Sequence, residues 1–124
     1  MATKSNSYPA DPNSDIDMLM GIGAAPEGVI TATALRGLDA PFEGRLVFKN
    51  EGHRERAESM IDGDVDRIWG RDELCSSDDS VFIGSGVCTG RTRGVEILDD
   101  GRASVHSEII DVNSGEHTYV SSVR

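Results

Sequence analysis

Two glycine-containing turns in the last third of the chain constrain its fold more than any other sequence feature. Residues 98–102 read LDDGR and residues 112–116 read VNSGE. In each segment the polar residues favour a type I turn, and the glycine can take the left-handed position that follows it. The sequence therefore predicts a three-stranded antiparallel meander between Val87 and Arg124.

Three-residue hairpin loops at both turns would fix the register of this meander. Ile97 would then pair with Ala103, and Val105 would pair with Val123. Because side chains alternate across a strand, a one-residue slip would exchange the two faces. The predicted core face holds Val95, Ile97, Ala103, Val105, Ile109, Tyr119 and Val123, and the mostly polar face holds Glu96, Ser104, His106, Glu108 and Glu116.

The first half of the chain predicts a hairpin followed by two helices. Residues 29–35 (VITATAL) alternate and are rich in β-branched side chains, which favours a strand, and residues 42–48 would be its partner. Residues 53–61 and 64–69 show apolar residues at helical spacing. We expect an α+β domain of order ββααβββ, in which a small antiparallel sheet (N-terminal hairpin plus C-terminal three-stranded meander) packs on one or two helices.

Length and composition predict one soluble domain preceded by an arm. The chain has 124 residues, 37% of them hydrophobic and 27% charged, which is typical of a globular protein. Residues 1–14 are polar and predict a flexible arm, and residues 15–124 would form the single domain. No apolar run spans a bilayer and no signal peptide is visible, so a cytoplasmic (or virion) location is expected.

The acidic balance limits the partners that this chain can bind. The net charge is −10 and the sequence pI is about 4.6, so the surface repels nucleic acid and anionic lipid. We expect no direct contact with nucleic acid or membrane. Arginine greatly outnumbers Lys4 and Lys49, a bias that fits a salt-rich cytoplasm as well as ordinary acidic composition.

One end of the predicted core face is polar and gives the candidate catalytic residues. His117 would lie opposite Asp111 and could be oriented by its carboxylate, as a general base requires. Arg91 would lie beside them, whereas Ser107 would be too distant for direct activation. The alternative is a salt-bridged rim in which Arg91 pairs with Asp111.

A second candidate is a calcium loop over residues 62–73. Carboxylates stand at loop positions that suit calcium, namely Asp62, Asp64, Asp66 and Glu73. Arg67 occupies the position where such a loop needs glycine. The alternative is a helix cap followed by solvated charges.

The sequence offers no signature of a cofactor. The histidines and cysteines lack the paired spacing of structural zinc sites. Gly21 and Gly23 have no third glycine in frame, so they make no dinucleotide fingerprint, and no phosphate-cradling loop is visible. We therefore predict no cofactor.

These features favour a non-enzymatic assembly or protein-binding subunit, such as a structural or virion component that forms a homo-oligomer. An unpaired sheet edge could extend across a subunit boundary. An acidic regulator that mimics nucleic acid is a further alternative.

A small enzyme is the other alternative. Residues 102–123 (RASVHSEIIDVNSGEHTYVSSV) resemble the last hairpin of hot-dog-fold proteins. That resemblance implies an acyl-CoA thioesterase or hydratase and transfers no catalytic residue, because the histidine- or aspartate-bearing helix of that family is not visible.

Overall fold

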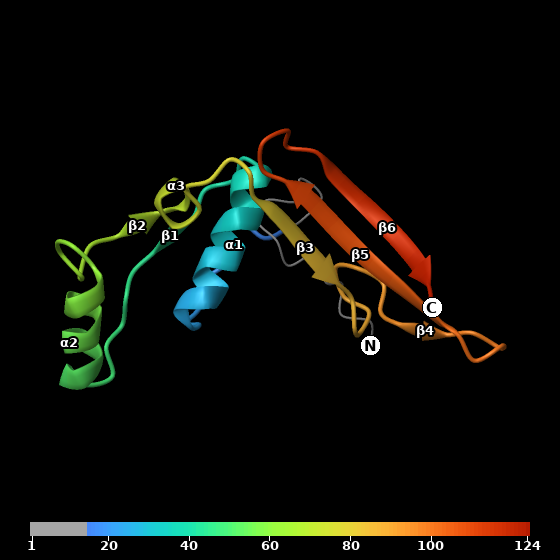
Figure 1. Cartoon of the computed structure of the whole chain (residues 1–124), viewed down its shortest axis with the longest axis horizontal. Coiled ribbons are helices and arrows are strands. Elements are labelled where there is room, and N and C mark those ends of the chain that lie inside the picture. The colour runs from blue at the N-terminus through green and yellow to red at the C-terminus, as the bar shows by residue number, and fades with distance from the viewer. Residues whose placement is uncertain (1–14) are drawn as a thin grey trace.

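The computed structural model describes residues 15–124, so the arm predicted at residues 1–14 lies outside the described part. Figure 1 shows an antiparallel sheet with one long helix beside it and a separate arm of short elements. In chain order the elements are α1 (Ala25–Gly37), β1 (Glu43–Gly44), α2 (Glu51–Met60), β2 (Trp69–Gly70), α3 (Arg71–Leu74), β3 (Val81–Ser85), β4 (Glu96–Ile97), β5 (Ala103–Asp111) and β6 (His117–Val123).

The strand predicted at residues 29–35 is wrong, because this segment lies inside α1. Pro26 stands in the first turn, where a missing N–H costs nothing, and Glu27 and Arg36 complement the helix dipole at its two ends. The hydroxyl of Thr31 donates to the carbonyl of Glu27 at 2.8 Å. Helix signals at the ends of the segment therefore outweigh the β-branched residues within it.

The other elements predicted in the first half are found only in part. The helix predicted at 53–61 is confirmed as α2, whose N-cap Asn50 accepts a bond from the His53 N–H at 3.0 Å. The strand at 42–48 shrinks to β1, which pairs with β2. The helix at 64–69 is absent because the Asp64 carboxylate instead closes a local turn onto the Asp66 N–H at 2.9 Å.

The meander is present, and β3 joins it. Both β3 and β4 pair with β5 along different parts of its length, and β6 pairs antiparallel with β5 as well. The first turn has the predicted register, since Ile97 pairs with Ala103. Gly101 has a φ of 82°, as the left-handed turn position requires.

The second hairpin is shifted by one residue from the prediction. Ser104, not Val105, pairs with Val123. The loop is one residue longer than expected because Val112 leaves the hairpin, and its N–H donates to the carbonyl of Ser80 at 3.0 Å. Asp111 instead pairs with Glu116 through the N–H of Asp111 at 2.9 Å.

The shift moves the side chains of β6 to the opposite face, and the packing of α1 makes the other face of β5 the covered one. The face toward α1, here called the helix face, carries Ser104, His106, Glu108 and Ile110 of β5. Of these, His106 is half-buried and the other three are buried. Ile110 is 1% exposed and packs against Gly37 of α1. A Cβ added at Gly37 would lie 2.4 Å from Cγ2 of Ile110. The predicted core face is wrong: of its members, Ile97 is 74% and Tyr119 63% exposed.

The arm formed by β1, α2 and β2 extends away from the sheet (Figure 1), and α2 has no buried residue. Within the described residues, no helix is both long and apolar enough to cross a bilayer.

Candidate functional site

The N-terminus of α1 is the first candidate site. Gly21 and Gly23 lead into the helix, and Ala24 is its N-cap. Alanine has no side-chain acceptor, so the helix start has no side-chain cap. The first N–H groups of a helix point out of its end and carry the positive pole of its dipole. Such an end, reached through flexible glycines, suits a phosphate group.

A buried ionic cluster on the helix face is the second candidate. The carboxylate of Glu108 accepts two bonds from Nε of Arg91, at 3.0 and 2.8 Å. Nε2 of His117 lies 3.1 Å from the same carboxylate. The side chain of Glu108 is 5% exposed, against 17% for Arg91 and 23% for His117. One desolvated carboxylate therefore joins a loop residue to the neighbouring strand.

The loop that supplies Arg91 packs closely on the sheet. At Gly86 an added Cβ would lie 2.2 Å from the carbonyl oxygen of Arg93, and at Gly94 it would lie 2.6 Å from the N of Thr89. Both glycines are buried. The loop over residues 86–94 thus needs glycine at its two ends to close, and the Arg91–Glu108 pair holds its centre on β5.

A hollow of about 370 Å³ opens beside this loop. Two arginines face it, but Arg91 is paired with Glu108 and Arg93 lies 2.5 Å from the carboxylate of Glu96. These pairs leave little excess positive charge for an anion, so the cluster is better suited to hold the loop. The lining residues are Arg91, Thr92, Arg93, His106, Ser107, Tyr119, Val120 and Ser121.

The structure brings together two of the three predicted catalytic residues. Arg91 and His117 meet, but at Glu108 and not at Asp111. The carboxylate of Asp111 caps its own turn by accepting from the N–H of Ser114 at 2.8 Å, which lowers the pKa of Asp111. Ser107 bonds Ser85 at 2.8 Å on the opposite face of the sheet.

The predicted calcium ligands do not converge. The carboxylate of Asp66 binds Arg54 through two nitrogens, at 3.0 and 2.5 Å, which lowers the pKa of Asp66. Glu73 accepts from the N–H of Gly70 at 2.8 Å, and this bond is the largest cause of its lowered pKa. Asp64 closes a turn, and Asp62 lies beyond the end of α2. Among residues 15–124 no group of three His, Cys, Asp or Glu side chains could hold a metal ion.

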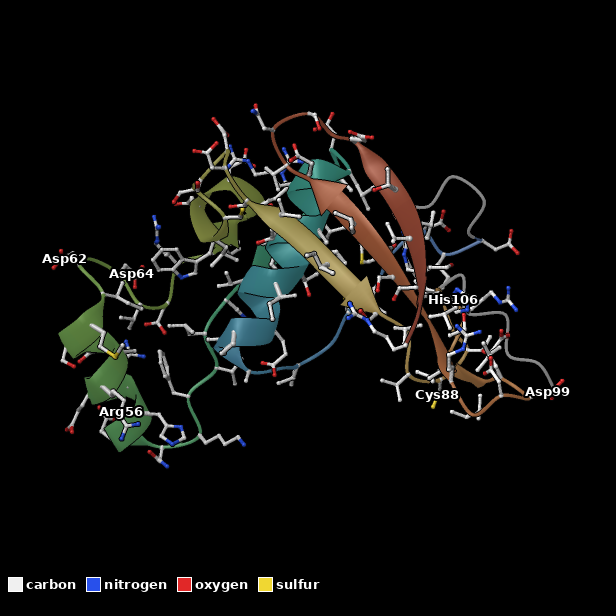
Figure 2. The ribbon with its side chains drawn as sticks, turned by 45° about the vertical axis from the view of Figure 1, so that its right-hand side comes forward. Arg56, Asp62, Asp64, Cys88, Asp99 and His106 are labelled. Atoms are coloured by element: carbon white, nitrogen blue, oxygen red, sulfur yellow. The ribbon has the colours of Figure 1, made fainter. Side chains whose placement is uncertain are left out.

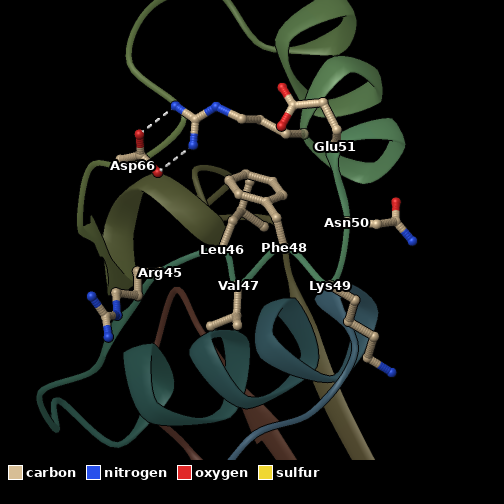
Figure 3. Close-up of a pocket in the computed structure, with 9 residues that line it drawn as sticks. Arg45, Leu46, Val47, Phe48, Lys49, Asn50, Glu51 and Asp66 are labelled. Carbon is tan, nitrogen blue, oxygen red and sulfur yellow. Dashed lines mark hydrogen bonds and ion pairs between the residues drawn. The ribbon is translucent and has the colours of Figure 1, made fainter.

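A further hollow of about 480 Å³ lies on the arm between β1 and α2. Figure 3 shows Asp66 and Phe48 among its lining residues, and the carboxylate of Asp66 binds the guanidinium of Arg54. The guanidinium carbon of Arg54 lies 5.4 Å from the ring centre of Phe48. A carboxylate and an aromatic ring thus hold Arg54 in place, and these contacts help to fix the shape of the arm.

Two functional features escaped the sequence prediction. Alternation along residues 103–111 predicts Glu108 on a solvent face, because it assigns the core to the apolar face, whereas α1 packs on the face of Glu108 and Ile110. The sequence does not predict the helix start at Ala24, because the β-branched alternation of residues 29–35 favours a strand. Pro26 followed by Glu27 is the signal that could have located it, since proline in the first turn and an acidic residue beside it are typical of a helix start.

The family of the chain follows from its match to known proteins. A family model described as bacterial fructose-1,6-bisphosphatase, glpX-encoded, matches residues 7–124. The chain therefore belongs to the bacterial fructose-1,6-bisphosphatase family, a class of phosphatases.

Individual relatives carry a more particular description. Proteins of Prochlorococcus marinus strains AS9601 and MIT 9303 are 42% and 44% identical over 85 residues, which is 58% of this chain and 26% and 25% of theirs. A protein of Nostoc sp. PCC 7120 is 32% identical over 123 residues, covering 89% of this chain and 35% of its own. Each is described as D-fructose 1,6-bisphosphatase class 2/sedoheptulose 1,7-bisphosphatase. The chain thus spans between a quarter and about a third of these relatives.

The family match corrects the function expected from the sequence. A non-enzymatic assembly, structural or virion subunit is wrong, because the family is one of enzymes. The missing catalytic signature misled that prediction. The hot-dog and nucleic-acid-mimic alternatives are set aside by the same match.

Proposed function

We propose that this chain forms part of a cytoplasmic sugar-bisphosphatase that releases phosphate from fructose 1,6-bisphosphate or sedoheptulose 1,7-bisphosphate. The observation that carries the proposal is the family match over residues 7–124, together with the names of the relatives. We further propose that residues 15–124 act as one α+β unit of that enzyme.

In this proposal the N-terminus of α1 binds a phosphate of the substrate. Ala24 leaves the helix without a side-chain cap, so the phosphate would accept the bonds that a capping side chain would otherwise accept. Gly21 and Gly23 allow the preceding backbone to approach the anion closely. The net charge of the chain is −10, so its overall electrostatic field repels a bisphosphate. The fixed backbone N–H donors at the helix start supply a local attraction that offsets this repulsion.

The ionic cluster has a positioning role in this proposal. Arg91 and His117 hold the carboxylate of Glu108 between them and keep the loop at residues 86–94 on the sheet. Phosphatases commonly hold divalent cations between carboxylates. Since the described residues form no such group, further carboxylates of the reacting centre would come from outside residues 15–124.

A matched pair of substitutions tests the phosphate site. The Nostoc relative is expressed with its matched segment replaced by this chain, and phosphate release is measured as kcat and KM. Ala24→Asp supplies a capping carboxylate that competes with phosphate for the helix N–H groups, so KM for the bisphosphate should rise by about tenfold or more. Ala24→Gly keeps the helix start open and should leave KM nearly unchanged. Equal KM values in the two variants would refute the proposed phosphate site.

A further inference from the structure

Two Asp-Gly pairs, Asp62-Gly63 and Asp100-Gly101, lie far apart in the molecule. Figure 2 shows Asp62 at the outer tip of the arm and Asp99, the neighbour of the second pair, at the far end of the sheet. All four residues of the two pairs are exposed. Both glycines have a positive φ, 102° at Gly63 and 82° at Gly101. The two pairs therefore share sequence and exposure, and they differ in their hydrogen bonds.

An Asp-Gly pair is chemically able to rearrange to isoaspartate without an enzyme. The backbone nitrogen of the glycine attacks Cγ of the protonated aspartic acid, and the acid hydroxyl leaves with the amide proton as water. Water then opens the resulting five-membered imide at either carbonyl. Opening at the former backbone carbonyl gives isoaspartate, which has the same mass, one more methylene in the main chain and a free α-carboxylate. Glycine favours the attack because it has no Cβ to obstruct it.

The pair Asp100-Gly101 is held in a form that resists this reaction. The N–H of Gly101, whose nitrogen would attack, donates to the carbonyl of Leu98 at 2.9 Å. The carboxylate of Asp100 accepts from Nε of Arg102 at 2.8 Å and from the N–H of Arg102 at 3.1 Å. The Arg102 side chain is the largest cause of the lowered pKa of Asp100, so the carboxyl stays ionised and cannot lose its hydroxyl as water.

The pair Asp62-Gly63 has none of these restraints. Within residues 15–124, neither the Asp62 carboxylate nor the Gly63 N–H has a hydrogen-bond partner. A Cβ added at Gly63 would meet no atom within 4 Å, so the backbone there has room to move. The helix α2 ends at Met60, and the next local restraint is the turn in which the Asp64 carboxylate accepts from the Asp66 N–H. The nitrogen of Gly63 is thus free to reach Cγ of Asp62.

We propose that Asp62 is a modification site, at which the folded protein rearranges spontaneously to isoaspartate while Asp100 is protected. The extra methylene would lengthen the connection between α2 and Asp66, whose carboxylate binds Arg54. The modification therefore acts on the ion pair that helps to fix the shape of the arm. The inference rests on the hydrogen bonds of the two pairs and not on the proposed phosphatase activity.

Ageing of the full chain at neutral pH, both folded and in urea, tests the inference. After proteolysis, isoaspartate in each peptide is measured by chromatography with mass spectrometry and by methylation with an isoaspartyl methyltransferase and S-adenosylmethionine. Urea removes the hydrogen bonds, so the ratio of isoaspartate at Asp62 to that at Asp100 reports there only the intrinsic difference between the pairs. In the folded chain this ratio should be at least about tenfold higher, because structure protects one pair alone.

Two matched substitutions assign the signal. Asp62→Glu keeps the charge but would need a larger imide ring, so it should remove most of the methylation of the folded chain. Asp100→Glu, the control, should leave that methylation nearly unchanged. The inference is overturned if the ratio in the folded chain is no higher than in urea, or if the folded chain accumulates no isoaspartate at Asp62.

Discussion

The buried carboxylate of Glu108 gives the sharpest stability prediction. Glu108→Gln keeps the size of the side chain but removes the charge that Arg91 and His117 share. Removing one partner of a buried ion pair typically costs about 3–5 kcal/mol. Because the side chains of Arg91 and His117 are 17% and 23% exposed and keep some access to water, we expect a loss near 3 kcal/mol. Such a loss is a large part of the ~5–15 kcal/mol that stabilises a typical domain.

Urea unfolding of the full chain, followed by circular dichroism, measures this loss. Glu116→Gln is the matched control, because Glu116 is exposed in the turn before β6 and its substitution should change the free energy of unfolding by no more than about 0.5 kcal/mol. A double-mutant cycle with Arg91→Met should give a coupling of about 1.5–3 kcal/mol between Arg91 and Glu108. If Glu108→Gln lowers the free energy of unfolding by less than about 1 kcal/mol, the ion pair does not hold the loop on the sheet as described.

Three further results are expected. Gly86→Ala should destabilise the chain by about 1–3 kcal/mol in urea unfolding, because its Cβ would strike the carbonyl oxygen of Arg93. The control Gly28→Ala lies in α1 with open space around it and should stabilise the chain by about 0.5–1 kcal/mol. Equal effects of the two substitutions would contradict the close packing at Gly86. NMR should show an Hα–Hα contact between His106 and Ser121, which pair across β5 and β6; a contact from His106 to Ser122 would restore the register predicted from the sequence. The pKa of the Asp66 carboxyl should lie below the usual aspartate value of about 3.9, because Arg54 pairs with the charged form. The stability from this ion pair is therefore present above that value and is lost as pH falls through the lowered pKa. In Arg54→Met the pKa of Asp66, measured by NMR titration, should return to the usual value, and an unchanged pKa would exclude Arg54 as the cause.

Local turn chemistry is the part of the fold that the sequence predicts best. The Gly101 turn and the pairing of Ile97 with Ala103 follow from a few adjacent residues. The second hairpin does not, because the N–H of Val112 bonds to Ser80, which is distant in sequence. This one tertiary bond lengthens the loop and moves the side chains of β6 to the opposite face, which local patterns could not reveal.

The candidate site was predictable only in part for the same reason. Arg91 and His117 were found as a pair because both are polar residues near one end of the meander. Their shared partner was misplaced from Glu108 to Asp111 by the slip in register. The face of the sheet opposite α1 explains the wrong core prediction as well, because its apolar alternation indicates a core although α1 covers the other side. Apolar alternation identifies a surface to be covered, but not what covers it.

Phosphate release by the Nostoc relative carrying this chain in place of its matched segment is the most direct test of the proposed function. We expect the chimera to hydrolyse fructose 1,6-bisphosphate or sedoheptulose 1,7-bisphosphate with a kcat/KM within about tenfold of the unchanged relative, a difference of about 1.4 kcal/mol. A chimera that folds, as judged by its cooperative unfolding, but releases no phosphate from either substrate would contradict the placement of this chain within a working sugar-bisphosphatase.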